Sequence, residues 1–432
     1  MTTERQDLSE FIRAVQGGDS EALRDVLRRF PALRQELDEP HFAFDTPAVV
    51  AARGHPDVLD VLLEHGADIN TKSRWWAGGF GVLDFVALTP EDDRWAEALI
   101  ARGAVVGAHA AAGLGRIDRL RQLLDADPGL VHSRGGDGQT PLHFARTVEV
   151  ASLLLDRGAD IDARDVDHES TPAQYRVKDS PDVARFLVAR GCQTDILLAA
   201  ALGDLPLVQR LLAADPAVLH LRVTHDHFPC TGLRAGGHIY QWTLGLYLSP
   251  HQVARQFGHT DVYEYLLAQS PPPTQLVEKC WEGDLSAVDR LLVAAPHAKD
   301  AIPPADSRLI AHAARNNLPL AVRAFLRAGF PIDATSQHGA TALHWAAFHG
   351  EPGMTENLLQ HRAPLELTDC DFHGTPLGWA AHGSTHGWYA SKGDYARTAT
   401  LLLAAGARPN ASMLRVAAEP VARILRQALG HN

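Results

Sequence analysis

Three stretches of the sequence concentrate the residue types that bind ligands or move protons. They are residues 71–85, 222–249 and 368–406, and each interrupts a pattern that repeats through the rest of the chain. The chain has 23 histidines among its 432 residues, and each of the last two stretches holds several of them. Because an imidazole titrates near neutral pH and a carboxylate can orient it, a histidine beside an aspartate suits acid–base chemistry. We therefore expect a functional site in these stretches.

The longest stretch, 222–249, carries the letters HDHFPC and, further on, GGHIYQW. Imidazole and thiolate groups are ligands for zinc. The alternative metal site in this stretch would comprise His225, His227, Cys230 and His238. No second group in the chain repeats this spacing, so we expect no metal there. The histidines then make hydrogen bonds within a structural flap that folds back across the concave face.

The third stretch, 368–406, combines imidazoles, carboxylates and aromatic rings. It contains Asp371, His373, His382, His386, Trp388, Tyr389 and Asp394. Such a cluster can transfer protons, or it can form a hydrogen-bond network that stiffens a long turn. The candidate catalytic residues of an acid–base enzyme are His227, His238, His386 and Asp371. The motifs GxGxxG, GxxxxGKS/T, HExxH and GxSxG are absent from the sequence, so we expect a binding protein rather than an enzyme.

Adjacent tryptophans, Trp75 and Trp76, precede three glycines in the first stretch. Two bulky rings on a bendable backbone make a platform for a planar ligand or a partner side chain. The alternative is that one ring packs beneath the turn as an anchor. The residues predicted to bind a partner or ligand are Trp75, Trp76, His227, His238, Tyr240, Trp242, His373, His382, His386 and Trp388.

The elements that must position these residues are predicted by a repeat of Gly, Leu and Pro. In four segments a glycine is followed nine residues later by leucine and thirteen residues later by proline. The glycines are Gly18, Gly115, Gly203 and Gly283. Other segments begin with Thr-Pro, where threonine caps a helix and proline occupies its first turn. A second helix then ends at a glycine suited to a left-handed conformation, such as Gly66 or Gly158.

Short motifs in these units resemble the ankyrin repeat family. They are TPLH at 140–143, TALH at 341–344, GADIN and GADID after paired leucines, and AARGH before a second helix. The resemblance covers nearly all of the chain and implies an all-α, ankyrin-type solenoid of about 12–13 helix-turn-helix repeats with hairpin fingers and one long inserted loop. It also implies a concave binding surface, and structural imidazoles at His143 and His344.

The chain is expected to divide into four segments. Residues 1–221 form N-terminal ankyrin-like repeats, and residues 222–249 form a long inserted finger loop. Residues 250–410 resume the repeats, and residues 411–432 form C-terminal capping helices. Such a cap presents a polar outer face where the stack ends.

The composition excludes several classes of protein. With 46% hydrophobic and 21% charged residues the chain can bury a large core. The net charge is −12 and the basic residues are scattered singly, which argues against a nucleic-acid partner. Because the sequence lacks an apolar run of ~18–20 residues and a signal-peptide pattern, we expect no membrane association and a cytoplasmic location. We also expect a monomer without a cofactor.

Two functions from different classes fit these observations. The favoured one is an ankyrin-repeat binding scaffold that recognises a partner protein or peptide on its concave finger surface. The acidic charge favours a partner with a basic patch. The alternative is a polar small-molecule site, or an enzyme, in a His/Trp/Asp-lined concave pocket closed by the 222–249 loop. A third possibility is that the insertions only brace the array. The pocket requires the three stretches to meet in space.

Overall fold

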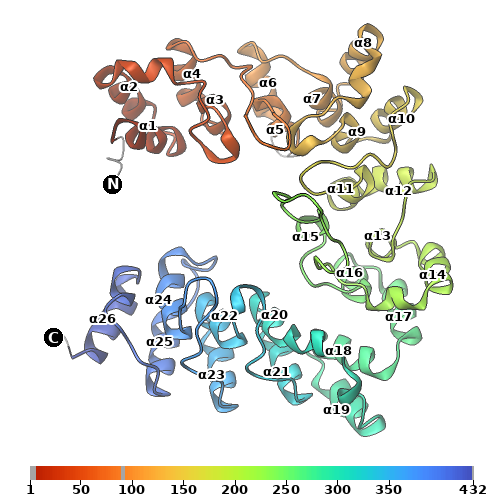
Figure 1. Ribbon diagram of the computed structural model, residues 1–432, viewed down its shortest axis with the longest axis vertical. Helices are drawn as coiled ribbons and strands as arrows, with labels where there is room; N and C mark the ends of the chain where they lie inside the picture. The colour runs from red at the N-terminus through yellow and green to blue at the C-terminus, as the bar shows by residue number, and fades with distance from the viewer. Residues whose placement is uncertain (1–5, 89–92, 431–432) are drawn as a thin grey trace. The chain divides into compact units, whose positions relative to one another are not determined.

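The computed structural model describes residues 6–88 and 93–430 of the chain. Its contacts divide it into two compact units, Met1–Tyr265 and Leu266–Asn432. Within each unit, α-helices stack as consecutive pairs in chain order (Figure 1). The described residues form no β-strand, and their β-type pairing consists of isolated antiparallel bridges at two finger turns. The prediction of an all-α repeat array is confirmed.

The helices of the first unit are α1 (Gln6–Gln16), α2 (Ser20–Arg29), α3 (Ala48–Ala51), α4 (Pro56–Glu64), α5 (Val82–Ala87), α6 (Asp93–Ala101), α7 (Ala108–Gly113), α8 (Ile117–Ala126), α9 (Pro141–Phe144), α10 (Val148–Asp156), α11 (Pro172–Asp179), α12 (Pro181–Ala189), α13 (Ile196–Leu202), α14 (Leu205–Ala214), α15 (Tyr240–Thr243) and α16 (Pro250–Gln256). The division between the units falls inside α17 (Thr260–Gln269). The helices of the second unit are α18 (Pro272–Glu282), α19 (Leu285–Ala294), α20 (Leu309–Arg315), α21 (Pro319–Arg327), α22 (Ala342–His349), α23 (Pro352–Gln360), α24 (Pro376–His386), α25 (Tyr395–Ala404) and α26 (Glu419–Ala428).

Thr-Pro pairs begin helices, as the sequence predicts. Helices α9, α11 and α24 start at Pro141, Pro172 and Pro376. Proline fits there because a first-turn residue has no helical acceptor for its amide hydrogen in any case. In α24 the side-chain oxygen of Thr375 also accepts the amide hydrogen of Gly378.

Left-handed glycines end the helices. Gly203 ends α13 and Gly283 ends α18, each with a φ of 70°. Gly66 and Gly158, which follow second helices, have φ values of 97° and 88°. Glycine adopts these angles without steric cost. The turns predicted from the glycine pattern are therefore confirmed.

Some first helices of the pairs are buried on all sides. Every residue of α13 is buried, and α22 packs against both α20 and α24. Within α22, Leu343 and Trp345 are 1% and 2% exposed. A helix sandwiched between the preceding and following repeats buries both of its faces, which explains the continuous apolar sequence.

Two buried imidazoles connect successive repeats. His143 and His344 are fully buried, and Nδ1 of each accepts the amide hydrogen of the threonine that precedes its helix. Nε2 of each then donates to a carbonyl of the next finger, Ser170 O and Gly374 O, at 3.1 Å in both cases. The structural role implied for these histidines is confirmed.

The C-terminal segment, 411–432, differs from the predicted capping helices. In its described part a single α-helix, α26, follows a 3₁₀ turn, η10 (Met413–Arg415). The Asn410 side chain accepts hydrogen bonds from the amides of Ser412 and Met413. These bonds satisfy amide hydrogens at the start of the 3₁₀ turn.

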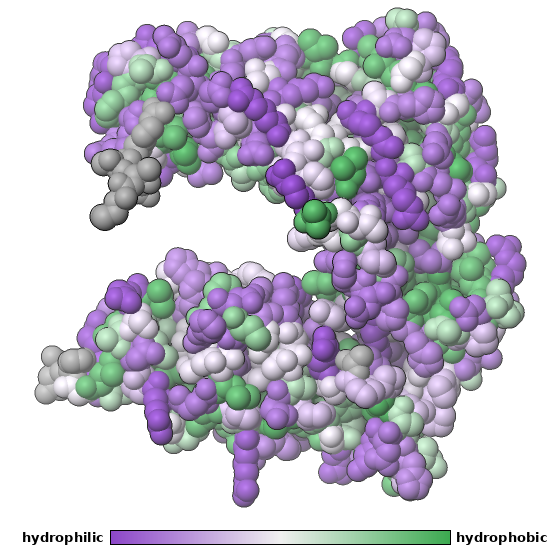
Figure 2. All heavy atoms as spheres, in the orientation of Figure 1, coloured by the Kyte–Doolittle hydropathy of each residue, from purple (hydrophilic) through white to green (hydrophobic). Residues whose placement is uncertain are grey.

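No helix among the described residues is long and apolar enough to cross a membrane. Hydrophilic residues predominate over the surface visible in Figure 2, with hydrophobic residues dispersed among them. The exposed large hydrophobic side chains include Trp242, Phe372 and Trp388. These three belong to the stretches that interrupt the repeats.

Candidate functional site

Two neighbouring fingers of the first unit meet at Asp137. The first finger includes the 3₁₀ turn η5 (Gly136–Gly138), and the second comprises residues 165–170. The Asp137 carbonyl accepts the amide hydrogens of Val166 and Asp167, with N–O distances of 2.8 and 3.1 Å. Asp137 has a φ of 56°, a left-handed conformation that persists in a non-glycine residue where the surroundings hold it. The backbone thus fixes Asp137 beside the second finger.

The second finger is braced from within by Asp165. Its carboxylate accepts the amide hydrogens of His168 and Ser170, at 2.8 and 2.7 Å, and the hydroxyl hydrogen of Tyr175, at 2.9 Å. Burial raises the pKa values of the Asp165 carboxyl and the Tyr175 hydroxyl. Because this network holds both ends of the turn, it sets where the side chain of His168 lies.

The 222–249 loop folds back onto this second finger. The amide of Gly236 donates to Asp167 Oδ1 at 2.8 Å. His168 Nδ1 donates to the carbonyl of Gly237 at 2.6 Å, because a carbonyl can only accept. The long insertion therefore contacts the second finger, whereas its course across the concave face stays a prediction.

The loop also reaches the finger that carries the paired tryptophans. The guanidinium of Arg234 lies 5.2 Å from the centroid of the Trp76 ring. Trp75, whose ring packs edge-on against Trp76, donates from Nε1 to Asp137 Oδ1 at 3.0 Å. Both tryptophans are half-buried. Two of the three predicted stretches, 71–85 and 222–249, therefore meet in the first unit.

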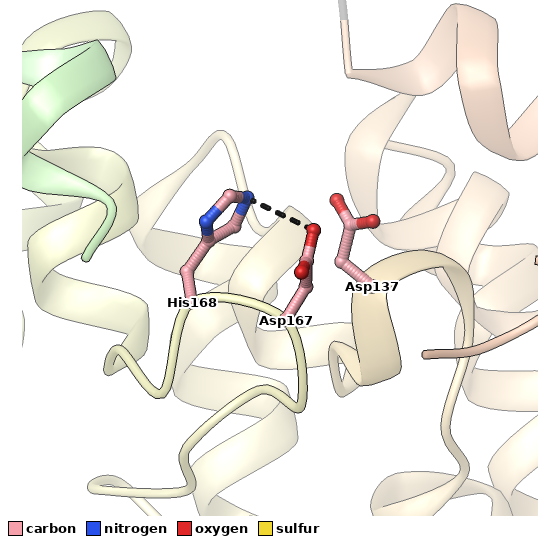
Figure 3. A group of neighbouring side chains, drawn as sticks. All are labelled: Asp137, Asp167 and His168. Atoms are coloured by element: carbon pink, nitrogen blue, oxygen red, sulfur yellow. Dashed lines mark ion pairs between the residues drawn. The ribbon is translucent and has the colours of Figure 1, made fainter. Parts of the chain in front are cut away.

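Asp137, Asp167 and His168 form a group of possible metal ligands (Figure 3). One ligand atom from each lies within 4.8 Å of the others. His168 Nε2 is 3.7 Å from Asp167 Oδ2, and these side chains are 12% and 9% exposed. Burial raises the pKa of the Asp137 carboxyl; His168 opposes this rise, and the neighbouring carboxylates of Asp167 and Asp165 add to it. The arrangement gathers negative charge where little water can reach it.

The alternative ligands of the 222–249 stretch do not form such a group within the described residues. His227 Nδ1 accepts the amide hydrogen of Arg222, and Cys230 Sγ contacts the carbonyl of His168 at 3.4 Å. The ring of His238 lies 4.9 Å from that of Phe228. His225 is exposed.

Burial removes two predicted binding residues from reach of a partner. His238 and Tyr240 are 3% and 0% exposed, and the Tyr240 hydroxyl donates to Asp195 Oδ2 at 2.7 Å. Burial also lowers the pKa of His238 to about 4. The sequence predicted that these two residues bind a partner or ligand, but their rings form the loop's own small core. Trp242 is 65% exposed.

A finger of the second unit is held by the same arrangement of hydrogen bonds. Asp369 holds its finger as Asp165 does in the first unit, accepting the amide hydrogens of Phe372 and Gly374 at 2.6 and 2.7 Å. Trp379 donates to it from Nε1 at 2.8 Å, in the place of the tyrosine hydroxyl. The fingers are joined as before, since the carbonyl at position 338 accepts the next finger's amide.

The side chains at the junction differ between the units. His338, in the 3₁₀ turn η9 (Gln337–Gly339), occupies the position of Asp137, and Asp371 that of Asp167. His338 Nδ1 and Asp371 Oδ2 lie 2.6 Å apart. An imidazole thus faces a carboxylate where the first unit has two carboxylates.

An aromatic surface lies beside this junction in the second unit. It comprises Arg315, Phe348, Phe372, His382 and Trp388. Trp388 is 59% exposed and stacks on the buried Trp345, with ring centroids 5.9 Å apart and planes inclined by 25°. The Arg315 guanidinium lies 5.6 Å from the Trp345 centroid and 5.3 Å from that of Trp388. The exposed indole of Trp388 is therefore held by its contacts with Trp345 and Arg315.

Phe372 extends the aromatic surface onto the finger. It is 70% exposed, and its ring lies 5.6 Å from that of His338, which in turn lies 6.3 Å from Trp345. The predicted residues His373, His382 and His386 are also exposed, and the ring centroids of the last two lie 4.8 Å apart with the planes tilted by 36°. Of the four catalytic candidates, His227 and His238 belong to the first unit, and His386 and Asp371 to the second.

A cavity of about 280 Å³ lies elsewhere in the first unit. Its polar lining includes Lys72, Asp84, His109 and Arg134. Burial lowers the pKa of His109, whose Nε2 lies 3.1 Å from the carbonyls of Ser133 and Gln139. None of the binding residues predicted from the sequence lines this cavity.

Stacked helix pairs with finger turns between them define a helical-repeat protein. A family model described as "Ankyrin repeats (3 copies)" matches residues 108–197, 251–369 and 310–413, and one described as "Ankyrin repeat" matches residues 45–74. The chain belongs to the ankyrin repeat family. Ankyrin repeats generally serve as protein-interaction scaffolds.

Two curated proteins are similar to short parts of the chain. It is 41% identical over 73 residues to "Ankyrin repeat domain-containing protein SAT10" of Stachybotrys chartarum, which is 17% of this chain and 4% of that protein. It is 47% identical over 49 residues to "Serine/threonine-protein kinase VIK" of Arabidopsis thaliana, which is 11% of each chain. The match therefore covers a small fraction of each relative.

Sequence reasoning missed the residues at the finger junctions. Asp137, Asp167 and His168 lie in ordinary repeats, whereas the residues predicted from the sequence lie in the interruptions. A signal was present, because the fingers at 135–140 and 336–341 align with an aspartate in one and a histidine in the other. Arg315 and Phe372 carry no distinctive motif.

Proposed function

We propose that this ankyrin repeat protein binds a partner protein or peptide through the aromatic surface of its second unit. The observation that carries the proposal is the ring of Trp388, which is 59% exposed and is held against Trp345 and Arg315. Tryptophan and arginine are enriched among residues that dominate binding energy. Because the ring is already held in place, little side-chain entropy is lost on binding.

The expected occupant is a partner segment that presents an aromatic or aliphatic side chain. That side chain packs against Trp388 and Phe372, whose exposed rings offer apolar area from the turn and the finger. The exposed imidazoles of His373, His382 and His386 flank these rings as polar contacts. The net charge of −12 favours a basic patch elsewhere on the partner, which increases the association rate.

A selection from a peptide display library tests this proposal. The immobilised protein is screened in three forms: wild type, Trp388→Ala and Trp242→Ala. Trp242 is the matched control because it is equally a tryptophan, is 65% exposed and lies in the first unit. We expect peptides with an apolar anchor residue that bind wild type and Trp242→Ala but not Trp388→Ala. Enriched peptides that bind all three forms equally, or no enrichment, would overturn the proposal.

A second candidate function is a small-molecule site in the first unit beneath the 222–249 loop. The observation in its favour is the contact of Arg234 with Trp76, which closes the loop onto the tryptophan finger. A thermal-shift screen of polar metabolites against wild type and Arg234→Ala tests it, since a ligand that binds only the folded state raises Tm. A stabilising compound whose effect is lost in the variant supports the site. The absence of any such compound counts against it.

A further inference from the structure

Asp137, Asp167 and His168 each keep one ligand atom after their hydrogen bonds are counted. Asp137 Oδ1 is bound by Trp75 Nε1, and Asp167 Oδ1 by the amide of Gly236. His168 uses Nδ1 to donate to a loop carbonyl. Within the described part of the chain this leaves Asp137 Oδ2, Asp167 Oδ2 and His168 Nε2 without a hydrogen bond. Because Nδ1 carries the hydrogen, Nε2 presents a lone pair.

These atoms lie near the spacing that a bound metal ion requires. All three ligand atoms are within 4.8 Å of one another, and Asp167 Oδ2 is 3.7 Å from His168 Nε2. Ligands at about 2.1 Å from an ion are about 3.0–3.4 Å apart, so rotations of the side chains by about 1 Å complete the geometry. The three side chains approach one another from two fingers (Figure 3).

The hydrogen bonds around the group are those of an outer coordination shell. A metal-binding histidine commonly donates its other ring hydrogen to a carbonyl, and binding carboxylates are themselves hydrogen-bonded. His168, Asp167 and Asp137 all meet this description through Gly237, Gly236 and the Trp75 indole. Each bond therefore fixes the orientation of one ligand.

At the equivalent junction of the second unit, a neighbouring side chain interacts with the carboxylate. There His338 faces Asp371 at 2.6 Å, so that a cationic or hydrogen-bonding group meets the carboxylate. The first unit places Asp137 opposite Asp167, and the latter side chain is 91% buried, since 9% is exposed. Two facing carboxylates in such a place need a cation or a shared proton. His168 replaces Phe372 at the next position and adds a nitrogen ligand.

We propose that Asp137, Asp167 and His168 bind a divalent transition-metal ion that fastens the 222–249 loop to the fingers. The mixed nitrogen and oxygen donors favour Zn²⁺ over Mg²⁺ or Ca²⁺, which take oxygen ligands. Three protein ligands leave room for water to complete the coordination. The ion connects to the loop because Gly236 and Gly237 hold two of its ligands. The proposal concerns the first unit and is independent of partner binding.

Calorimetric titration of Zn²⁺ into the chelator-treated 432-residue chain tests the site. The variants are Asp137→Asn and Asp167→Asn, which keep the side-chain size and the oxygen that accepts a hydrogen bond. Asp371→Asn is the matched control, because it makes the same change at the same finger position of the second unit. We expect saturable one-to-one binding by wild type and the control, and at least about tenfold weaker binding by the other two variants. Mg²⁺ should give no saturable heat.

Two results would overturn the proposal: no saturable Zn²⁺ binding by wild type, or equal binding by wild type, Asp137→Asn and Asp167→Asn. Hydrogen exchange provides a second readout that needs no variant. Zn²⁺ should slow amide exchange in residues 222–249 of wild type, and unchanged exchange counts against an ion that fastens the loop. If either variant fails to fold, X-ray absorption at the zinc edge of wild type decides, with nitrogen and oxygen ligands expected and sulfur ligands contradicting the site.

Discussion

The finger junctions of the two units have the same backbone arrangement but different side chains. In each, a left-handed residue accepts the amide hydrogen of the next finger through its carbonyl, and a buried aspartate braces that finger. The first unit fills the junction with Asp137 and Asp167, and the second with His338 and Asp371. Stacking constrains the backbone of a finger but not the tip side chains, so the tips can diverge while the repeat persists.

The two junctions also differ in how far neighbouring segments cover them. In the first unit the 222–249 loop covers His168, whereas in the second the equivalent Phe372 is 70% exposed. The expanded turn between α24 and α25 adds Trp388 to the exposed side. One junction is therefore suited to holding an ion inside the protein, and the other to contacting a partner.

The largest expected effect is on partner binding. Trp388→Ala should weaken the affinity for a peptide selected on wild type by at least about 30-fold, or about 2 kcal/mol, because it removes a preorganised aromatic anchor. Trp242→Ala should change the affinity by less than about threefold. Fluorescence polarisation with a labelled peptide measures both, and circular dichroism confirms folding. Equal losses in the two variants would remove the distinction between the units.

The next largest effect is expected at the equivalent buried histidines of the two units. His143→Ala and His344→Ala should each lower the free energy of unfolding of their own unit by about 2–3 kcal/mol, because each change leaves a buried carbonyl without its donor. Urea unfolding, monitored by hydrogen exchange in each unit separately, measures these changes in the free energy of unfolding. A large loss in one unit and none in the other would show that the two histidines do not have equivalent roles.

The same imidazoles predict an acid dependence of stability. Burial lowers the pKa of His143 from 6.5 to about 3 and also lowers that of His344. Their stabilising contribution is complete above the unfolded value and is lost as the pH falls below it, for His143 down to about 3. Wild type should therefore lose stability between pH 6.5 and pH 3 more steeply than the double variant His143→Ala/His344→Ala. Parallel pH profiles would contradict this.

Asp137→Asn should have effects of opposite sign with and without Zn²⁺. The folded-state pKa of Asp137 is raised from 3.8, so its ionisation opposes folding at neutral pH, and this cost declines as the pH falls from the raised folded-state value to 3.8. Asp165, Asp167 and His168 are the ionisable side chains that face Asp137. In chelator at pH 7 the variant should be more stable than wild type, and in saturating Zn²⁺ less stable. Thermal unfolding measures the reversal, and a shift of the same sign in both buffers contradicts it.

The smallest effect is expected at the equivalent pair of the second unit. Asp371→Asn should lower the free energy of unfolding by less than about 1 kcal/mol, because the side chain of Asp371 is half-exposed and water replaces most of the interaction with His338. Urea unfolding in chelator and in Zn²⁺ should give the same result. A loss that appears only with Zn²⁺ would place an ion in the second unit as well.

Much of the fold follows from the sequence because stacking imposes local rules. Thr-Pro starts, left-handed glycines and apolar first helices are visible as residue types at fixed spacing, and the structure confirms them. The end of the array was less predictable, since a 3₁₀ turn stands there in place of one of the expected helices.

The sites were predictable only in part. Trp388 stood out as an aromatic residue in an interruption, and it is exposed as a binding residue must be. His238 and Tyr240 had the same appearance in sequence, yet they are buried because the loop packs on itself. The group at Asp137 depends on a contact between fingers and a distant loop, and no local pattern reports such a contact.

We propose that the same finger arrangement holds an ion in the first unit and leaves an open binding surface in the second. Anomalous diffraction at the zinc edge from crystals grown with Zn²⁺ tests this claim most directly. We expect a peak about 2.1 Å from one ligand atom each of Asp137, Asp167 and His168, and none between His338 and Asp371. A map without a peak at the first junction, or with equal peaks at both, would contradict it.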